Sequence, residues 1–171
     1  FKFICEIAPD KALFDFLVVK NDFHNIKAVL KSLVVDTDYA PYVLEPCLIA
    51  PSDIYSAAVS KDWKSLPSFA VEAVKKGYEL VTATKDGQVL DVYLDKCYLE
   101  TSIKMAKESK EDFSVGLAER TALIADLQIA LRGSEMGKSK EFLKNAMADC
   151  GILDTDRIIS LSLAGKKEIS D

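Results

Sequence analysis

Apolar residues recur along this chain at the three- and four-residue spacing of amphipathic helices, and no alternating pattern favours a strand. The first apolar-periodic stretch covers residues 13–19, and Asn21 or Asp22 is placed to cap a second helix. Prolines concentrate in residues 39–51, which predicts an irregular loop there. We expect Ser52 to cap a short helix directly after this loop.

The middle of the chain predicts two longer helices. Pro67 suits the first turn of one helix, which is expected to run to about Thr84. The Lys-Asp-Gly turn at residues 85–87 ends it. Residues 88–109 then predict one long amphipathic helix, because their apolar positions follow a helical period.

The last third continues in the same way. Asp112 is placed to cap a still longer helix, and Gly133 and Gly137 are expected to end it. Its inward face is predicted to be the large apolar set Leu117, Leu123, Ile124, Leu127, Ile129 and Leu131. Shorter helices are expected at 139–149 and 155–163, each followed by a glycine. The fold class predicted for the whole chain is therefore all-α, with tandem helical-bundle units.

Composition agrees with a soluble helical protein. The chain has 171 residues, of which 49% are apolar and 29% charged, with only 7 glycines and 5 prolines. Its net charge of −5 argues against a nucleic-acid binder, which normally shows a basic face. No apolar run approaches the roughly 18–20 residues that a membrane span requires. The chain starts at Phe1 without a signal-peptide pattern, so we expect a piece of a longer product.

The cysteines and the single histidine give no reactive pattern. Four cysteines lie more than 40 residues apart without a CxxC pair, so free thiols are expected rather than zinc ligands or a disulfide framework. His24 is two residues after Asp22, which is one pattern for a general base. No serine is spaced to complete a triad, and a helix N-cap by Asp22 explains the same residues structurally.

Two further patterns bear on chemistry. Residues 133–139 end in Gly-Lys-Ser, but the spacing is not that of a phosphate-binding loop, and no strand is predicted before it. Asp91 and Asp95 lie one helical turn apart, where a solvated helix face accounts for them. We therefore expect no catalytic residue, no cofactor and no metal site.

An internal repeat is suggested by two helical segments. Residues 25–31 can be aligned with residues 126–132 at an offset of 101, and this alignment pairs Phe23 with Ile124. Farther on, a Ser-Asp pair and a Thr-Asp pair both open a helix after a loop. These matches favour a duplicated helical unit of about 100 residues.

Residues 20–31 read Lys-Asn-Asp-Phe-His-Asn-Ile-Lys-Ala-Val-Leu-Lys, and this segment resembles a motif of the C-type subunit of V-type ATPases, whose eukaryotic members are called d-type. Two other segments resemble the family in the same order, one around Asp95 and Tyr98 and one ending at Arg132. The residues that carry the resemblance are Asp22, Phe23, His24, Asn25, Lys27, Asp95, Tyr98 and Arg132, and a structural role is expected for them. The third segment departs from the pattern, because Leu123 and Asp126 occupy its usual acid and amide positions.

The resemblance implies a helical funnel built from three similar units, of which this chain contains a fragment. We expect residues 1–110 to be the first unit without its start, and residues 111–171 to be part of the second. Such a protein is a non-catalytic rotor adaptor on the cytoplasmic face of the membrane. Its implied partners are the central-shaft subunits and the membrane rotor ring, with contacts expected in residues 39–60 and 133–139.

Other functions remain open at this point. An unrelated helical scaffold for protein–protein interaction would have the same composition. A nucleotide hydrolase that uses Lys138 and Ser139 is a second alternative, and nucleotide binding by the chain would reveal it. A nucleic-acid role is least compatible with the acidic charge.

Overall fold

The computed structural model describes residues 11–165, which contain α-helices, short 3-10 turns and loops but no strand. In chain order the elements are η1 (Lys11–Phe14), α2 (Asp15–Val35), η2 (Ala40–Tyr42), α3 (Pro51–Ser60), η3 (Trp63–Ser65), α4 (Ser68–Thr84), α5 (Gly87–Ser109), α6 (Asp112–Glu135), α7 (Lys140–Ala146) and α8 (Thr155–Ala164). The all-α fold class is confirmed.

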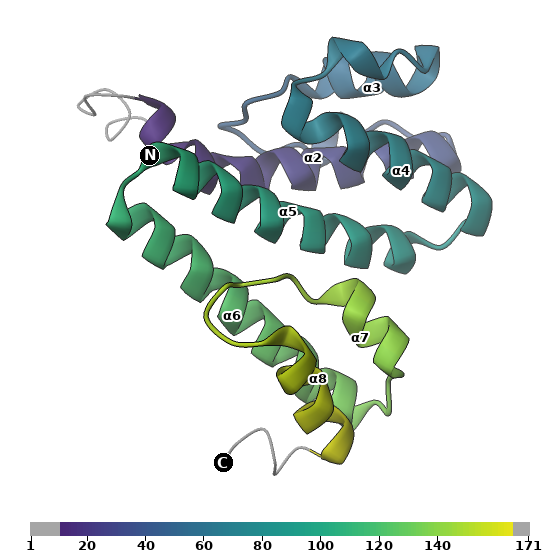
Figure 1. Cartoon of the computed structure of the whole chain (residues 1–171). Helices are drawn as coiled ribbons and strands as arrows, with labels where there is room; N and C mark the ends of the chain where they lie inside the picture. The colour runs from purple at the N-terminus through teal and green to yellow at the C-terminus, as the bar shows by residue number, and fades with distance from the viewer. Residues whose placement is uncertain (1–10, 166–171) are drawn as a thin grey trace.

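Helix α5 connects the two halves of the molecule. Figure 1 shows α2, α4 and α5 running side by side, with α3 along their outer edge, while α6, α7 and α8 lie on the other side of α5. Accordingly, α5 packs against α2 and α4 on one side and against α6 and α7 on the other. A helix that is shared in this way transmits a displacement of one half to the other, because packed interiors hardly compress.

The buried side chains form three clusters that follow this arrangement. The largest joins α2, α3, α4 and the first half of α5, and it contains the fully buried Phe23, Ile26 and Leu94. A second cluster lies between the second half of α5 and the first half of α6, around Leu99. The third joins the end of α6 to α7 and α8 around Leu143.

Helix α2 is longer than the sequence predicted. It runs without interruption from Asp15 to Val35, so the cap expected at Asn21 or Asp22 is wrong. No glycine or proline interrupts this segment, and its first apolar stretch continues directly into the second. The Asp22 carboxylate is free to bind elsewhere because it is not needed as a helix cap.

Other helix ends lie close to their predicted places, with small corrections. Helix α3 begins at Pro51, so Ser52 lies inside it and is not its cap. Helix α4 ends at Thr84 as predicted. Helix α5 begins at Gly87, and the carboxylate of Asp86 accepts the N–H of Gln88 over 2.8 Å.

The buried face of α6 differs from the prediction. It consists mainly of small residues, Ser114, Ala118, Ala122, Asp126 and Ala130. Leu117 and Ile124, predicted to face inward, are 37% and 57% exposed. Small side chains let α6 approach its neighbours closely, and this geometry turns the larger ones outward. Asp112 is the first residue of α6 and not its cap.

The end of α6 is also corrected. Gly133 does not end the helix but lies buried inside it, where a Cβ atom would be 2.6 Å from Cδ2 of Leu143. The chain turns at Gly137, whose φ is +61°. Ser139 caps α7, accepting the N–H of Phe142 over 3.1 Å, but α7 stops at Ala146 rather than near residue 149.

Candidate functional site: a loop anchored on helix α2

Residues 41–50, called here the anchored loop, are attached to α2 by side chains of the sequence motif. Oδ1 of Asp22 accepts the main-chain N–H groups of Leu48 and Ile49, each over 2.8 Å. Beside it on the helix, Nδ2 of Asn21 donates to the carbonyl of Pro46 over 2.8 Å. These bonds supply partners for loop backbone groups that no helix or sheet satisfies.

Asn25 and His24 hold the first part of the same loop. The side-chain amide of Asn25 binds Leu44 twice, donating to its carbonyl over 3.0 Å and accepting its N–H over 2.8 Å. Nε2 of His24 lies 2.9 Å from the carbonyl oxygen of Tyr42 and donates to it as the Nε2–H tautomer. His24 therefore contacts the backbone of the anchored loop.

Asp22 is fully buried, with 0% of the residue exposed, and its second oxygen has no hydrogen-bond partner among the described residues. Loss of solvation raises its pKa to about 6, although the N–H groups of Ile49 and Leu48 lower it in part. An ionised carboxylate held here stabilises one loop conformation at an electrostatic cost.

Four residues of the sequence motif join α2 to α5, namely Lys27, Asp95, Phe23 and Tyr98. Lys27 forms an ion pair with Asp95, and one helical turn on, Lys31 pairs with Asp91 over 2.7 Å. The rings of Phe23 and Tyr98 pack at a centroid distance of 6.4 Å. The carboxylate pair noted in the sequence therefore faces lysines across a helix interface.

Arg132 is the motif residue that the structure does not bring to the anchored loop or to the interface between α2 and α5. It lies exposed near the end of α6, and its guanidinium has no hydrogen-bond or ion-pair partner within residues 11–165. Its side chain therefore takes no part in holding the anchored loop.

The anchored loop and α3 present large apolar side chains to solvent. These are Tyr42, Leu44, Leu48, Tyr55 and Val59, with exposures between 37% and 62%. No lysine, arginine or histidine occurs in residues 32–60, whereas four aspartates and glutamates do. An apolar surface whose backbone is fixed by hydrogen bonds to α2 is suited to bind another protein.

Sequence reasoning missed Asp126 as a second buried carboxylate. It lies at 0% exposure in the interior of α6, and its Oδ1 accepts the N–H of Ala148 over 2.9 Å. Burial raises its pKa to about 6, against the lowering effects of that N–H and of Lys96. An aspartate in the middle of an apolar helical stretch was the available signal.

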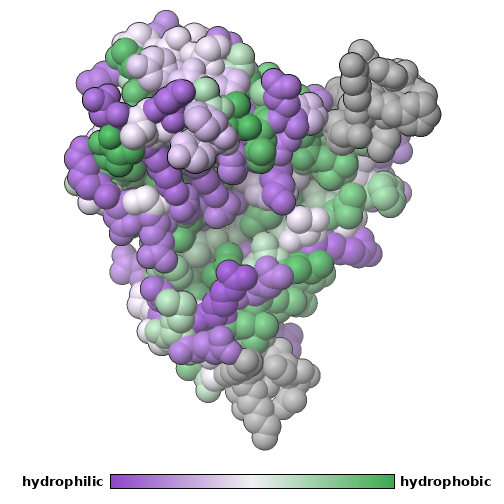
Figure 2. Space-filling model, turned by 180° about the vertical axis from the view of Figure 1, so that it is seen from behind, coloured by the Kyte–Doolittle hydropathy of each residue, from purple (hydrophilic) through white to green (hydrophobic). Residues whose placement is uncertain are grey.

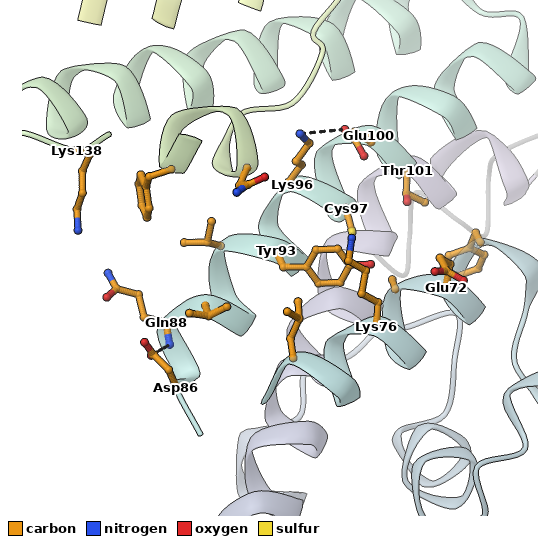
Figure 3. A pocket seen from close by; sticks show the side chains of 17 residues that line it. Glu72, Lys76, Asp86, Gln88, Tyr93, Lys96, Cys97, Glu100, Thr101 and Lys138 are labelled. Atoms are coloured by element: carbon orange, nitrogen blue, oxygen red, sulfur yellow. Dashed lines mark hydrogen bonds and ion pairs between the residues drawn. The ribbon is translucent and has the colours of Figure 1, made fainter. Parts of the chain in front are cut away.

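A groove of about 880 Å³ lies between α4, α5 and α7. Figure 3 shows Lys76 of α4 next to Tyr93 and Cys97 of α5, with Lys138 farther along the groove. The Lys76 ammonium lies 5.0 Å from the centroid of the Tyr93 ring. Burial raises the pKa of both Tyr93 and Cys97, so both are protonated near neutral pH and are poor nucleophiles.

Lys138 and Ser139, the candidates for nucleotide hydrolysis, do not form a phosphate-binding loop. They follow helix α6 instead of a strand, and the Ser139 hydroxyl caps α7. The ammonium of Lys138 lies 4.8 Å from the centroid of the Phe142 ring. Within residues 11–165, no group of three or more metal-ligating side chains is placed to hold a metal ion.

The described helices can be compared with the length and apolarity that a membrane span requires. No helix within residues 11–165 is both long enough and apolar enough to span a bilayer. On the face shown in Figure 2, hydrophobic side chains form separate patches among hydrophilic ones. Separate patches of this kind are compatible with contacts to other proteins.

Comparison with known proteins agrees with the resemblance found in residues 20–31. A family model described as "ATP synthase (C/AC39) subunit" matches residues 1–170. No curated protein and no solved structure matches the chain. Because the family model covers all the helices described above, the chain belongs to the ATP synthase (C/AC39) subunit family.

Proposed function

We propose that this chain is part of a non-catalytic rotor adaptor in a V-type ATPase or ATP synthase. The adaptor couples the central shaft to the membrane rotor ring, and ATP-linked proton or sodium-ion transport depends on that coupling. It works on the cytoplasmic face as a peripheral subunit. Membership of the ATP synthase (C/AC39) subunit family supports this role.

The mechanical properties of the fold suit torque transfer. Helix α5 packs against both halves of the molecule, and ion pairs and aromatic contacts reinforce its junction with α2. Close-packed helices resist deformation, so a force applied to one end reaches the other with little loss. An adaptor needs this stiffness and wide contact surfaces rather than a reactive pocket.

The observation that carries the proposal is the anchored loop. Several side chains of α2 bind its backbone and fix its conformation, yet the loop exposes apolar residues such as Leu44 and Leu48. A pre-organised loop loses little conformational entropy when it binds. We therefore propose residues 39–60 as a contact surface for another subunit.

Two further parts of the proposal are a second contact surface and the division of the chain into helical units. Residues 133–139 are proposed as a second contact, supported by the exposed Met136, of which 65% is accessible. Residues 1–110 and 111–171 are proposed as portions of two helical units, with the turn at Lys110 between α5 and α6 as the boundary.

Reconstitution of ion pumping tests the adaptor role. The host V-type ATPase is purified without this subunit and placed in vesicles, and the natural full-length subunit is added back. ATP-driven ion uptake should require the subunit, while ATP hydrolysis by the head should continue without it. Vesicles that pump equally well without the subunit would show that the adaptor role is wrong.

The contact surface is tested in the same assay with the Leu44→Ser/Leu48→Ser variant. Both side chains are exposed, so the fold should survive, but binding to the depleted complex should weaken by about tenfold or more. Phe113→Ser is the matched control, since Phe113 is 79% exposed and lies outside the loop. Equal binding by the two variants would count against residues 39–60.

A further inference from the structure

Asp22 holds the anchored loop through one of its two carboxyl oxygens. Oδ1 accepts the N–H groups of Leu48 and Ile49, whereas Oδ2 is buried and has no hydrogen-bond partner within residues 11–165. Burying an ionised carboxylate without a donor or a cation for each oxygen is costly, and a carboxyl group relieves this cost by taking up a proton. Oδ2 is therefore the atom of this side chain at which a proton is favoured.

Helix α2 supplies no positive charge to compensate Asp22. The residues one helical turn before and after it are buried and uncharged, namely Val18, Val19, Asn25 and Ile26. The side chains of Lys20 and His24 are exposed. Farther along the helix, Lys27 and Lys31 are already paired with aspartates of α5.

The elements packed around this part of α2 add no positive charge either. The loop contributes the thiol of Cys47, whose pKa is raised by burial, so the thiol stays neutral near pH 7. Helix α5 contributes Tyr98 and Ser102 here, and the buried side chains of α3 and α4 are apolar. Asp15, two helical turns earlier on α2, is acidic and favours a proton on Asp22 as well.

The anchored loop can respond to the charge of Asp22 because little else holds its main chain. Between residues 43 and 49, the main-chain hydrogen bonds within the described part of the chain all go to side chains of α2. Ile49 is buried, but the rest of the loop is exposed or half-buried. When the loop moves away, water reaches the carboxylate and stabilises its ionised form. Ionisation and detachment therefore favour each other.

We infer that Oδ2 of Asp22 is a proton-binding site that regulates the anchored loop, which is held on α2 when this oxygen is protonated and loosens when it is ionised. The use of this regulation rests on the proposed function, because the loop is the proposed contact for another subunit. A fall in pH then strengthens that contact, since a fixed loop loses less conformational entropy on binding.

The pKa of Asp22 gives the direction and the size of the effect. Burial raises this pKa to about 6 while the loop is attached, against 3.8 for an ordinary aspartate. The attached state therefore binds the proton more tightly, and its advantage is complete below about pH 4 and is lost as the pH rises through 6. Between pH 5 and pH 7.5, the ratio of attached to detached loop should fall about tenfold.

Hydrogen exchange of the natural full-length subunit, followed by mass spectrometry at pH 5 and pH 7.5, measures the attachment. Each rate is divided by that of the unfolded chain at the same pH, because exchange itself is faster at higher pH. Protection of residues 43–49 should fall about tenfold from pH 5 to pH 7.5. Protection that does not change with pH would refute the proton site.

Two variants show whether the response belongs to Asp22. Asp22→Asn keeps an acceptor for the loop but cannot ionise, so protection of residues 43–49 should no longer depend on pH. Asp126→Asn is the matched control, because Asp126 is an equally buried aspartate outside the loop, and this variant should keep the tenfold response. If Asp126→Asn reduces the response, the whole fold and not the loop responds to pH, and the inference is wrong.

The outcomes separate this inference from the proposed function. If loop protection responds to pH as expected but the Leu44→Ser/Leu48→Ser variant binds the depleted complex normally, the proton site stands and residues 39–60 are not a contact. If that variant binds weakly while loop protection is independent of pH, the contact stands and the proton site is wrong.

Discussion

Asp22 and Ile49 are joined across 27 residues of sequence, because the main-chain N–H of Ile49 donates to Oδ1 of Asp22 over 2.8 Å in a buried setting. The same oxygen binds the N–H of Leu48. One carboxylate thus satisfies two backbone groups of a loop that has no regular secondary structure there. The loop conformation therefore depends on a residue far away in the sequence.

Replacement of Asp22 should reveal that dependence. Asp22→Ala leaves the buried N–H of Ile49 and the partly buried N–H of Leu48 without their acceptor, so the free energy of unfolding should fall by about 2–4 kcal/mol. Asp22→Asn keeps an acceptor oxygen and should cost less. Urea unfolding of the full-length subunit measures both. Asp53→Asn, at an exposed position in the first turn of α3, is the control and should change stability by at most about 0.5 kcal/mol.

Stability should also depend on pH through the two buried aspartates. Their folded-state pKa values are about 6, above the ordinary 3.8, so the folded protein binds these protons more tightly than the unfolded chain. Their stabilising contribution is complete below about pH 4 and is lost as the pH rises through 6. Between pH 7.5 and 5 each group should therefore add about 1 kcal/mol.

The pH prediction is measured as a difference between proteins. Thermal or urea unfolding of the unchanged subunit and of the Asp22→Asn/Asp126→Asn variant is compared at pH 7.5 and pH 5. The unchanged protein should gain stability relative to the variant as the pH falls. An equal response of the two proteins would mean that these carboxylates do not titrate in this range.

Two glycines of α6 should respond in opposite ways to alanine. A Cβ at Gly133 meets the fully buried Leu143 at 2.6 Å, so Gly133→Ala should cost about 1–3 kcal/mol of stability. A Cβ at Gly116 meets only the flexible end of Arg120, so Gly116→Ala should add about 0.5–1 kcal/mol through helix propensity. Chemical unfolding curves measure both, and a neutral Gly133→Ala would contradict the close packing.

Native thiols should react slowly with iodoacetamide. Burial raises the pKa of Cys47 and Cys97, and the thiolate is the reactive form. Alkylation near pH 7.5 should therefore be slower than for a free cysteine, and unfolding in urea should abolish the difference. Cys5 lies outside the described residues, so the experiment uses the Cys5→Ser variant. The measured alkylation rates then come only from the remaining cysteines. Fast modification of Cys97, identified by mass spectrometry, would contradict its protection.

Several local features follow from the sequence because their causes are local. The helical period over residues 88–109 and the turn at 85–87 predict α5 and the end of α4 within a residue. Ser139 is predicted to begin a helix, and its hydroxyl caps α7. The propensities and caps that cause these features act within a few residues, so a single sequence contains them.

Other features depend on how helices approach one another. Whether Leu117 or Ala118 faces inward is decided by the distance between α6 and its neighbours, and the small residue lies inside. The glycine pattern predicts a helix end at Gly133, whereas this residue marks a close contact with Leu143, which lies outside its local turn. Hydrophobicity alone does not distinguish these cases, because either orientation buries apolar area.

By itself, the sequence determined the all-α class, most helix ends and the resemblance to a rotary ATPase subunit, since periodicity and motifs are properties of the linear chain. Only the tertiary structure decided what the motif does. Asp22 and Asn25 bind main-chain groups about 20 or more residues away, and Asp126 does the same in the other half. Buried polar groups must find partners wherever the fold brings them, so their roles appear only once the helices are packed.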